Sequence, residues 1–96
     1  MVRVYETTFI LKPDLEEGVR DEYLERVKGI ITDNQGEIVE TDVWGNKKLA
    51  YEINDYRTGF YTMITFKGEK ETVDELERNY KIIDDVLRYL IIRKEG

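Results

Sequence analysis

The stretch Glu37–Lys67 decides the fold, and it reads EIVETDVWGNKKLAYEINDYRTGFYTMITFK. Runs rich in β-branched and aromatic residues predict one strand over Glu37–Ile53 and another over Phe60–Lys67. The polar segment Asn54–Gly59 between them carries the residue types of a turn. The centre of the chain is therefore predicted to hold two consecutive strands with no helix between them.

The dipeptide Gly45-Asn46 interrupts the first of these strands and has two interpretations. It forms either a tight hairpin of its own or a bulge that bends one long strand. We favour the bulge, because the alternating pattern continues over Lys47–Ile53 and a clearer turn follows at Asn54–Gly59.

A helical segment precedes this central stretch and covers Pro13–Asn34. Asp14 followed by Glu17 has the spacing of a capping box, which indicates where the helix begins. Apolar residues then recur at three- and four-residue steps, as on one face of an amphipathic helix. Gly36 predicts the end of the helix, because glycine tolerates the left-handed backbone.

The second helical segment and two outer strands complete the pattern. The helical segment covers Glu69–Asp85, with the capping-box spacing repeated at Thr72 and Glu75. The outer strands are predicted over Val2–Lys12 and Leu87–Arg93. The resulting β-α-β-β-α-β order predicts an α+β, ferredoxin-like two-layer sandwich, with two helices on one face of a four-stranded antiparallel sheet. We expect residues 1–96 to form a single domain.

The composition excludes several classes of chemistry. The chain has a net charge of -6 and contains no His, no Cys and no Ser. Thiol and serine nucleophiles, Cys/His zinc sites and imidazole bases are therefore absent, and no enzyme activity, cofactor or metal is expected. No apolar run approaches the ~20 residues of a membrane span, and a signal-peptide pattern is missing at the start. We expect a cytosolic protein.

The charges are distributed unevenly along the chain. The two helical segments hold 14 of the 21 acidic residues and 6 of the 15 basic ones, a net charge near -8, whereas the strands and loops stand near +2. Solvated helix faces account for much of this difference, but a polyanion would still be expected to meet the strands and loops. The doublet Lys47-Lys48 has two interpretations there: it contacts phosphate, or it discourages aggregation at a sheet edge.

The face of the sheet away from the helices is expected to be unusually apolar. Strand parity puts the more apolar set on the helix side, for example Phe9 and Ile64, yet the opposite face keeps several apolar residues. An apolar cluster on central strands indicates a partner. The residues predicted to bind that partner are Val4, Glu6, Ile10, Met63, Leu90 and Ile92, with Glu6 suited to a cation from a basic partner. Tyr61 and Tyr89 are not expected side by side on this face, which argues against base stacking on the sheet.

The chain resembles the bacterial small-subunit ribosomal protein S6 family. The resemblance is carried by Gly45–Ile53, a glycine followed by basic residues and then Leu-Ala-Tyr-x-Ile, by Tyr5–Pro13, and by Gly59-Phe60-Tyr61. It extends from about Arg3 to Arg93, nearly the whole chain. Val4 departs from the family, in which many relatives have a basic residue at this position.

This resemblance implies a structural constituent of the small ribosomal subunit. Family members bind the central domain of the small-subunit ribosomal RNA together with the small basic ribosomal protein number eighteen. By position, Arg3, Lys47 and Lys48 are then expected to bind RNA. We add Arg57, which lies in the same weakly positive part of the chain, and expect all four to contact backbone phosphates.

Two other functions remain compatible with the residues. One is a homo-oligomeric ferredoxin-like interaction or regulatory domain without RNA binding, which would pair through the same open face. The other is a small enzyme of the dimeric α+β barrel type, which would need a perturbed Tyr, Lys or carboxylate in a pocket.

Overall fold

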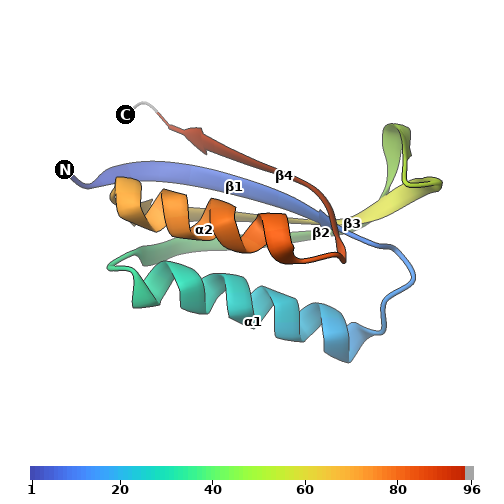
Figure 1. Ribbon diagram of the computed structural model, residues 1–96, viewed down its shortest axis with the longest axis horizontal. Helices are drawn as coiled ribbons and strands as arrows, with labels where there is room; N and C mark the ends of the chain where they lie inside the picture. The colour runs from blue at the N-terminus through green and yellow to red at the C-terminus, as the bar shows by residue number, and fades with distance from the viewer. Residues whose placement is uncertain (95–96) are drawn as a thin grey trace.

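The computed structural model describes residues 1–94 and contains four strands and two helices (Figure 1). The elements in chain order are β1 (Arg3–Leu11), α1 (Glu17–Asp33), β2 (Glu37–Ile53), β3 (Tyr56–Gly68), α2 (Lys70–Ile82) and β4 (Val86–Arg93). This order confirms the β-α-β-β-α-β prediction. None of the helices within residues 1–94 has the length and apolar character needed to cross a membrane.

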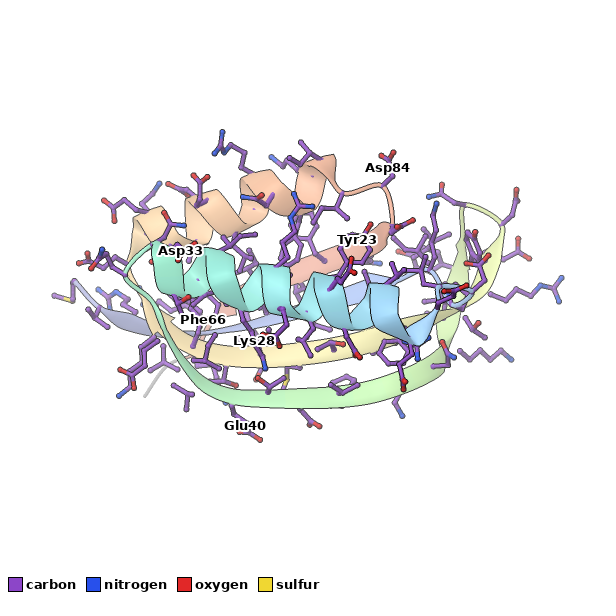
Figure 2. All side chains as sticks on the ribbon, turned by 90° about the horizontal axis from the view of Figure 1, so that it is seen from below. Tyr23, Lys28, Asp33, Glu40, Phe66 and Asp84 are labelled. Atoms are coloured by element: carbon purple, nitrogen blue, oxygen red, sulfur yellow. The ribbon has the colours of Figure 1, made fainter. Side chains whose placement is uncertain are left out.

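The strands form one antiparallel sheet in the order β2-β3-β1-β4. Both helices cover the same face of this sheet, and no helix of residues 1–94 covers the other face (Figures 1 and 2). Strands β2 and β3 follow each other in the chain and are neighbours in the sheet. α1 connects β1 to β2 and α2 connects β3 to β4, and in each case one other strand lies between the two connected strands. The predicted two-layer sandwich is therefore confirmed.

The core lies between the helices and the inner face of the sheet. Thr7, Phe9 and Leu11 of β1 are buried there, as are Ile64 and Phe66 of β3. The helices contribute their own buried residues to the same cluster, namely Val27, Ile31, Leu76 and Tyr80. The predicted strand parity is confirmed, because each of these strand residues belongs to the set assigned to the helix side.

One polar contact is buried within this core. The hydroxyls of Thr7 and Tyr80 lie 3.0 Å apart, and the Thr7 hydroxyl also donates to the backbone oxygen of Leu90 at 3.0 Å. Since Thr7 has one proton to donate, Tyr80 is the donor of the first bond. Burial raises the pKa of Tyr80 well above its ordinary value, partly offset by the bond to Thr7. Tyr80 therefore stays neutral and links α2 to β1.

The helix ends differ from their predictions. α1 begins at Glu17, not at Asp14, and its N-cap Glu16 makes no side-chain capping bond. At the other end Gln35, with φ of 68°, takes the left-handed conformation that was predicted for Gly36. Gly36 instead brings its backbone against α1 and donates to the Ile31 oxygen at 2.8 Å, so its lack of a side chain serves a close approach.

The capping box of α2 consists of Glu69 and Thr72, and thus lies three residues earlier than the predicted pair of Thr72 and Glu75. The helix begins at Lys70, and the backbone N–H of Glu69 donates to the Thr72 hydroxyl at 3.2 Å. The Thr72 hydroxyl in turn donates to the backbone oxygen of Asn34 at 2.7 Å. Thr72 thus acts inside the first turn, where it ties α2 to the end of α1, and not as the residue before the helix.

Strand β2 is continuous through Gly45, which confirms the predicted bulge. Val43 pairs with Thr62 and Gly45 with Tyr61, so Trp44 is the additional residue on the β2 side. Gly45 has φ of 85°, a conformation that favours glycine. The bulge bends the strand, and the hairpin of β2 and β3 projects past the end of the sheet (Figure 1).

The turn of this hairpin is shorter than predicted. Only Asn54 and Asp55 lie outside the strands, with φ of 50° and 70°, and Ile53 pairs with Tyr56 across them. Two consecutive left-handed residues are typical of the tight turns that join antiparallel strands. Residues 56–59 therefore belong to β3, where Thr58 and Gly59 pair with Lys48 and Lys47.

Gly59 is where the projecting hairpin contacts the sheet. A Cβ at this position would collide with Cγ2 of Ile10 and would lie 3.4 Å from Cδ2 of Leu49. Gly59→Ala is therefore expected to destabilise the fold by about 1–3 kcal/mol, measured by urea unfolding. Gly29→Ala is the matched control: nothing lies within 4 Å of its added Cβ, and helix propensity predicts a gain of about 0.5–1 kcal/mol. Equal effects of the two substitutions would contradict this packing constraint.

Candidate functional site

Three of the four predicted RNA-binding residues lie on the projecting hairpin. Lys47 and Lys48 are exposed on β2, and Arg57 is exposed on β3. Arg57 donates from Nε to Oε1 of Glu52 at 3.1 Å, which partly neutralises it. Within residues 1–94, Lys47 and Lys48 have no ion-pair partner. The two lysines therefore present their full charge to solvent.

The fourth predicted residue, Arg3, lies at the opposite end of the sheet. It begins β1 and pairs with Gly68, whereas the hairpin leaves the sheet near Leu11. The nine residues of β1 separate these ends by roughly 27 Å at the rise of an extended strand. The structure thus does not bring the four basic residues into one cluster.

The open face of the sheet carries the predicted apolar patch. Leu90 and Ile92 of β4 are 54% and 43% exposed, and Val4 and Met63 are half-buried beside them. Pairing of Thr8 with both Met63 and Leu90 places these strands side by side on this face. We call Val4, Met63, Leu90 and Ile92 the open-face patch.

Acidic side chains border the open-face patch. Glu6 pairs with Ile92 in the sheet, and its Oε2 lies 3.6 Å from Nζ of Lys94. Residues directly opposite in a pair share a face, so Glu40 and Asp42, which pair with Thr65 and Met63, also belong to the open face. Figure 2 shows Glu40 on the side away from the helices. The patch is therefore apolar at its centre and negative along its β2 side.

Ile10 differs from the prediction for this face. It has the expected parity, but only 7% of its surface is exposed. The reason is the hairpin, which folds Gly59 and Leu49 over it. The expectation that Ile10 forms part of an exposed patch is wrong, and a partner could reach it only through a groove at that point.

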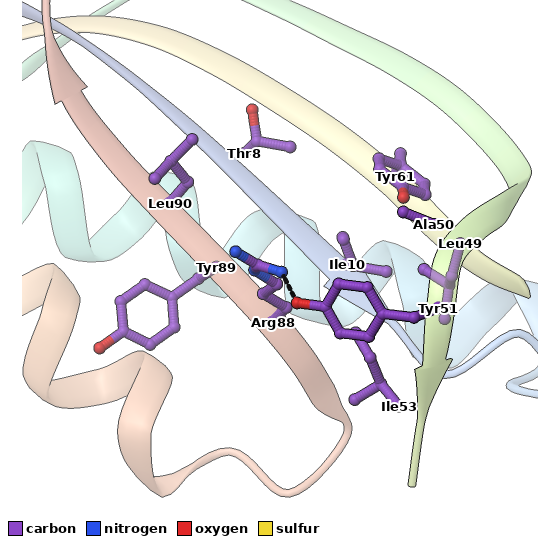
Figure 3. Close-up of a pocket in the computed structure, with 10 residues that line it drawn as sticks. All are labelled: Thr8, Ile10, Leu49, Ala50, Tyr51, Ile53, Tyr61, Arg88, Tyr89 and Leu90. Carbon is purple, nitrogen blue, oxygen red and sulfur yellow. Dashed lines mark hydrogen bonds between the residues drawn. The ribbon is translucent and has the colours of Figure 1, made fainter. Parts of the chain in front are cut away.

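This groove lies on the open face between the hairpin and β4, with Ile10 in its wall (Figure 3). Its volume is about 250 Å³. The Arg88 guanidinium of β4 donates to the Tyr51 hydroxyl of β2, and its Cζ lies 5.9 Å from the Tyr51 ring centroid. The remaining lining residues are Thr8, Leu49, Ala50, Ile53, Tyr61, Tyr89 and Leu90. We call this cavity the hairpin groove.

An aromatic pair adjoins the hairpin groove and was not predicted. The Trp44 and Tyr61 rings are stacked with centroids 6.2 Å apart, and Trp44 is 43% exposed. Trp44 also donates from Nε1 to Oδ2 of Asp42 at 2.8 Å. The bulge provides the signal that could have found this pair, because one additional residue on β2 brings the Trp44 ring to the face of Tyr61.

Arg88 and Tyr51 also received no predicted role. Arg88 shares its parity with Leu90 and Ile92, which places it on the open face, but its contact with Tyr51 depends on how far the hairpin folds back. Within residues 1–94 no group of acidic side chains is arranged to hold a metal ion. The site is therefore built from a basic hairpin, a groove and an apolar patch.

Comparison with known proteins gives consistent matches over nearly the whole chain. Residues 4–93 match the family model for ribosomal protein S6. The chain is 45% identical over 94 residues to the small ribosomal subunit protein bS6 of Moorella thermoacetica, covering 98% of this chain and 96% of that protein. It is 49% identical over 94 residues to bS6 of Thermoanaerobacter pseudethanolicus, covering 98% and 99%. The crystal structure of 30S ribosomal protein S6 from Thermotoga maritima is 35% identical with a TM-score of 0.93, covering 98% of this chain and 89% of that one.

Adjacent residues of β4 test the assignment of the two faces. Leu90→Asp places a charge on the open face and is expected to change the free energy of unfolding by about 0.5 kcal/mol at most. Ile91→Asp places the same charge against the core and is expected to cost more than about 2 kcal/mol. Thermal or urea unfolding measures both. If Leu90→Asp unfolded the protein and Ile91→Asp did not, the two faces would be assigned in the wrong sense.

Proposed function

Because this chain belongs to the ribosomal protein S6 family, it is a protein of the small ribosomal subunit, and we propose that it binds ribosomal RNA and a basic ribosomal protein through separate surfaces. A structural role in a ribonucleoprotein, and not catalysis, follows from the family. The proposed RNA surface is the hairpin, and the proposed protein surface is the open-face patch.

The observation that carries the RNA assignment is the exposed doublet Lys47-Lys48. These two lysines lie on the hairpin, which projects past the end of the sheet (Figure 1), and no carboxylate of residues 1–94 is paired with them. Phosphate contacts draw on such uncompensated cations. Arg57 would add a further phosphate contact, for which it would have to give up its ion pair with Glu52. Arg3, at the far end of β1, would contact a second stretch of RNA backbone.

The chemistry of the open face supports a basic protein partner. The open-face patch supplies apolar area, and Glu6, Glu40 and Asp42 supply negative charge around it. Glu6 is already approached by Lys94, which shows that a cation fits beside it. In line with the resemblance, we propose ribosomal protein number eighteen as this partner. Ile10 would contribute only where the partner reaches the hairpin groove.

The salt dependence of RNA binding tests the lysine doublet. Each lost phosphate contact lowers the slope of log affinity against log salt by about 0.7–0.9, so the double variant Lys47→Ala/Lys48→Ala should lower it by about 1.4–1.8. The measurement is a filter-binding titration with small-subunit ribosomal RNA. Lys70→Ala/Lys81→Ala on α2 removes the same charge from the helical layer and should leave the slope unchanged. An unchanged slope for the Lys47/Lys48 variant would rule out the assignment.

A single substitution tests the protein surface. Leu90→Asp puts a charge into the open-face patch and should weaken binding of the basic partner by more than about tenfold, since burying a leucine is worth roughly 1.5–3 kcal/mol. Isothermal titration with purified protein number eighteen measures the effect. Ile82→Asp is the control, because Ile82 is also an exposed aliphatic residue but lies at the end of α2. Equal affinity of the two variants would show that the partner binds elsewhere.

A further inference from the structure

We propose that the hairpin groove binds one unpaired nucleobase of RNA. The inference rests on the proposed RNA-binding function and adds the class of ligand and the place where it binds. It differs from the phosphate contacts of the hairpin lysines, which carry no sequence information.

The size and walls of the groove suit a single flat ring system. Its volume of about 250 Å³ lies below the roughly 300–1,000 Å³ of pockets for larger ligands. Aromatic rings of Tyr51 and Tyr61 belong to its lining, and the Trp44 ring backs Tyr61 in a stack. Figure 3 shows the Tyr51 side chain reaching from β2 toward Arg88 on β4 beside this space. Unpaired bases are bound by stacking on aromatic rings and guanidinium planes of this kind.

Two hydroxyl groups in the groove have bonding capacity left. Within residues 1–94, the hydroxyls of Thr8 and Tyr61 make no hydrogen bond to another protein group. A base offers donors and acceptors along its edge that such hydroxyls can meet. An aliphatic side chain from a protein partner would cover the same hydroxyls without giving them a partner, which costs free energy. The polar groups of the groove therefore favour a base over an aliphatic side chain.

The charge around the groove is complementary to a nucleotide. Residues 44–61 together with Arg88 hold four basic and two acidic side chains, although the chain as a whole has a net charge of -6. Lys47 and Lys48 lie on the same strand as Ala50 and Tyr51 of the groove wall. A base in the groove would thus place its neighbouring phosphates near uncompensated lysines. The open-face patch, by contrast, is bordered by carboxylates and disfavours RNA.

Nuclear magnetic resonance titrations with small probes test the proposal on the intact protein. The probes are the 5′-monophosphates of adenosine, guanosine, cytidine and uridine, and ribose 5-phosphate, which lacks the base. At least one nucleotide is expected to shift the amide signals of Thr8, Ala50 and Tyr61 in a saturable manner. Its Kd should be at least about fivefold lower than that of ribose 5-phosphate, because stacking of the base adds to phosphate attraction.

Matched variants assign the effect to the groove. Thr8→Val and Tyr61→Phe remove one hydroxyl each and should raise the nucleotide Kd by about two- to tenfold. Tyr56→Phe, on the same hairpin but outside the groove lining, should leave it unchanged. The amide spectrum of each variant reports directly whether the fold is intact.

Two results would overturn the proposal. In the first, nucleotides and ribose 5-phosphate bind equally and shift only the amides around Lys47 and Lys48. The groove then takes no base, while phosphate binding by the hairpin stands. In the second, N-acetyl-leucine amide saturates the groove signals and the nucleotides do not, which assigns the groove to an aliphatic side chain of a protein partner. The salt-slope experiment with ribosomal RNA decides separately whether the proposed function itself holds.

Discussion

The contact between Gly59 and Ile10 fixes the position of the hairpin on the rest of the molecule. A side chain at position 59 would collide with Ile10 on the neighbouring strand β1, so the backbone of β3 can approach the Ile10 side chain this closely only because this residue is glycine. Once the crossing is made, Leu49 and Gly59 bury Ile10, and Tyr51 comes within reach of Arg88. The groove and the contact of Tyr51 with Arg88 depend on this close approach, whereas the Trp44–Tyr61 pair and the bend of the hairpin depend on the bulge at Gly45.

The open face is consequently divided into two regions with different chemistry. The end near the start of β1 and the end of β4 holds the open-face patch, with Glu6, Glu40 and Asp42 along it. The hairpin end holds Lys47, Lys48 and Arg88 together with exposed aromatic rings. A basic protein and a polyanion would therefore be attracted to opposite ends of the same face, and the two sites meet at Leu90, which belongs to the open-face patch and also lines the hairpin groove.

What the sequence could predict follows from which interactions are local. Element order and strand parity were predictable, because a period of two along Tyr5–Leu11 directly reports the side that faces the helices. The bulge at Gly45 was predictable from the alternation beyond it. Burial of Ile10 depends on its contact with Gly59, which lies far away in the chain. Membership of residues 56–59 in β3 depends on their pairing with residues 47–53 across the turn, which the polar composition of Asn54–Gly59 does not indicate. For Ile10, the alternating pattern predicts that its side chain lies on the open face of the sheet, but it does not predict which other residues cover that side chain.

The helix starts illustrate the same limit on a smaller scale. Asp14 with Glu17 and Thr72 with Glu75 both have capping-box spacing, yet neither pair caps its helix. Thr72 instead forms a capping box with Glu69, as the third residue of the helix, and its hydroxyl also donates to the backbone oxygen of Asn34, 38 positions away, a contact that a short motif cannot predict. The distribution of charge shows why net charge alone is a poor guide to RNA binding. The net charge of -6 is a sum over the whole chain, and 14 of the 21 acidic residues lie in the helical segments predicted from the sequence. Those helices cover the face of the sheet opposite the groove, so the thickness of the sheet separates the surface that would meet RNA from most of the negative charge.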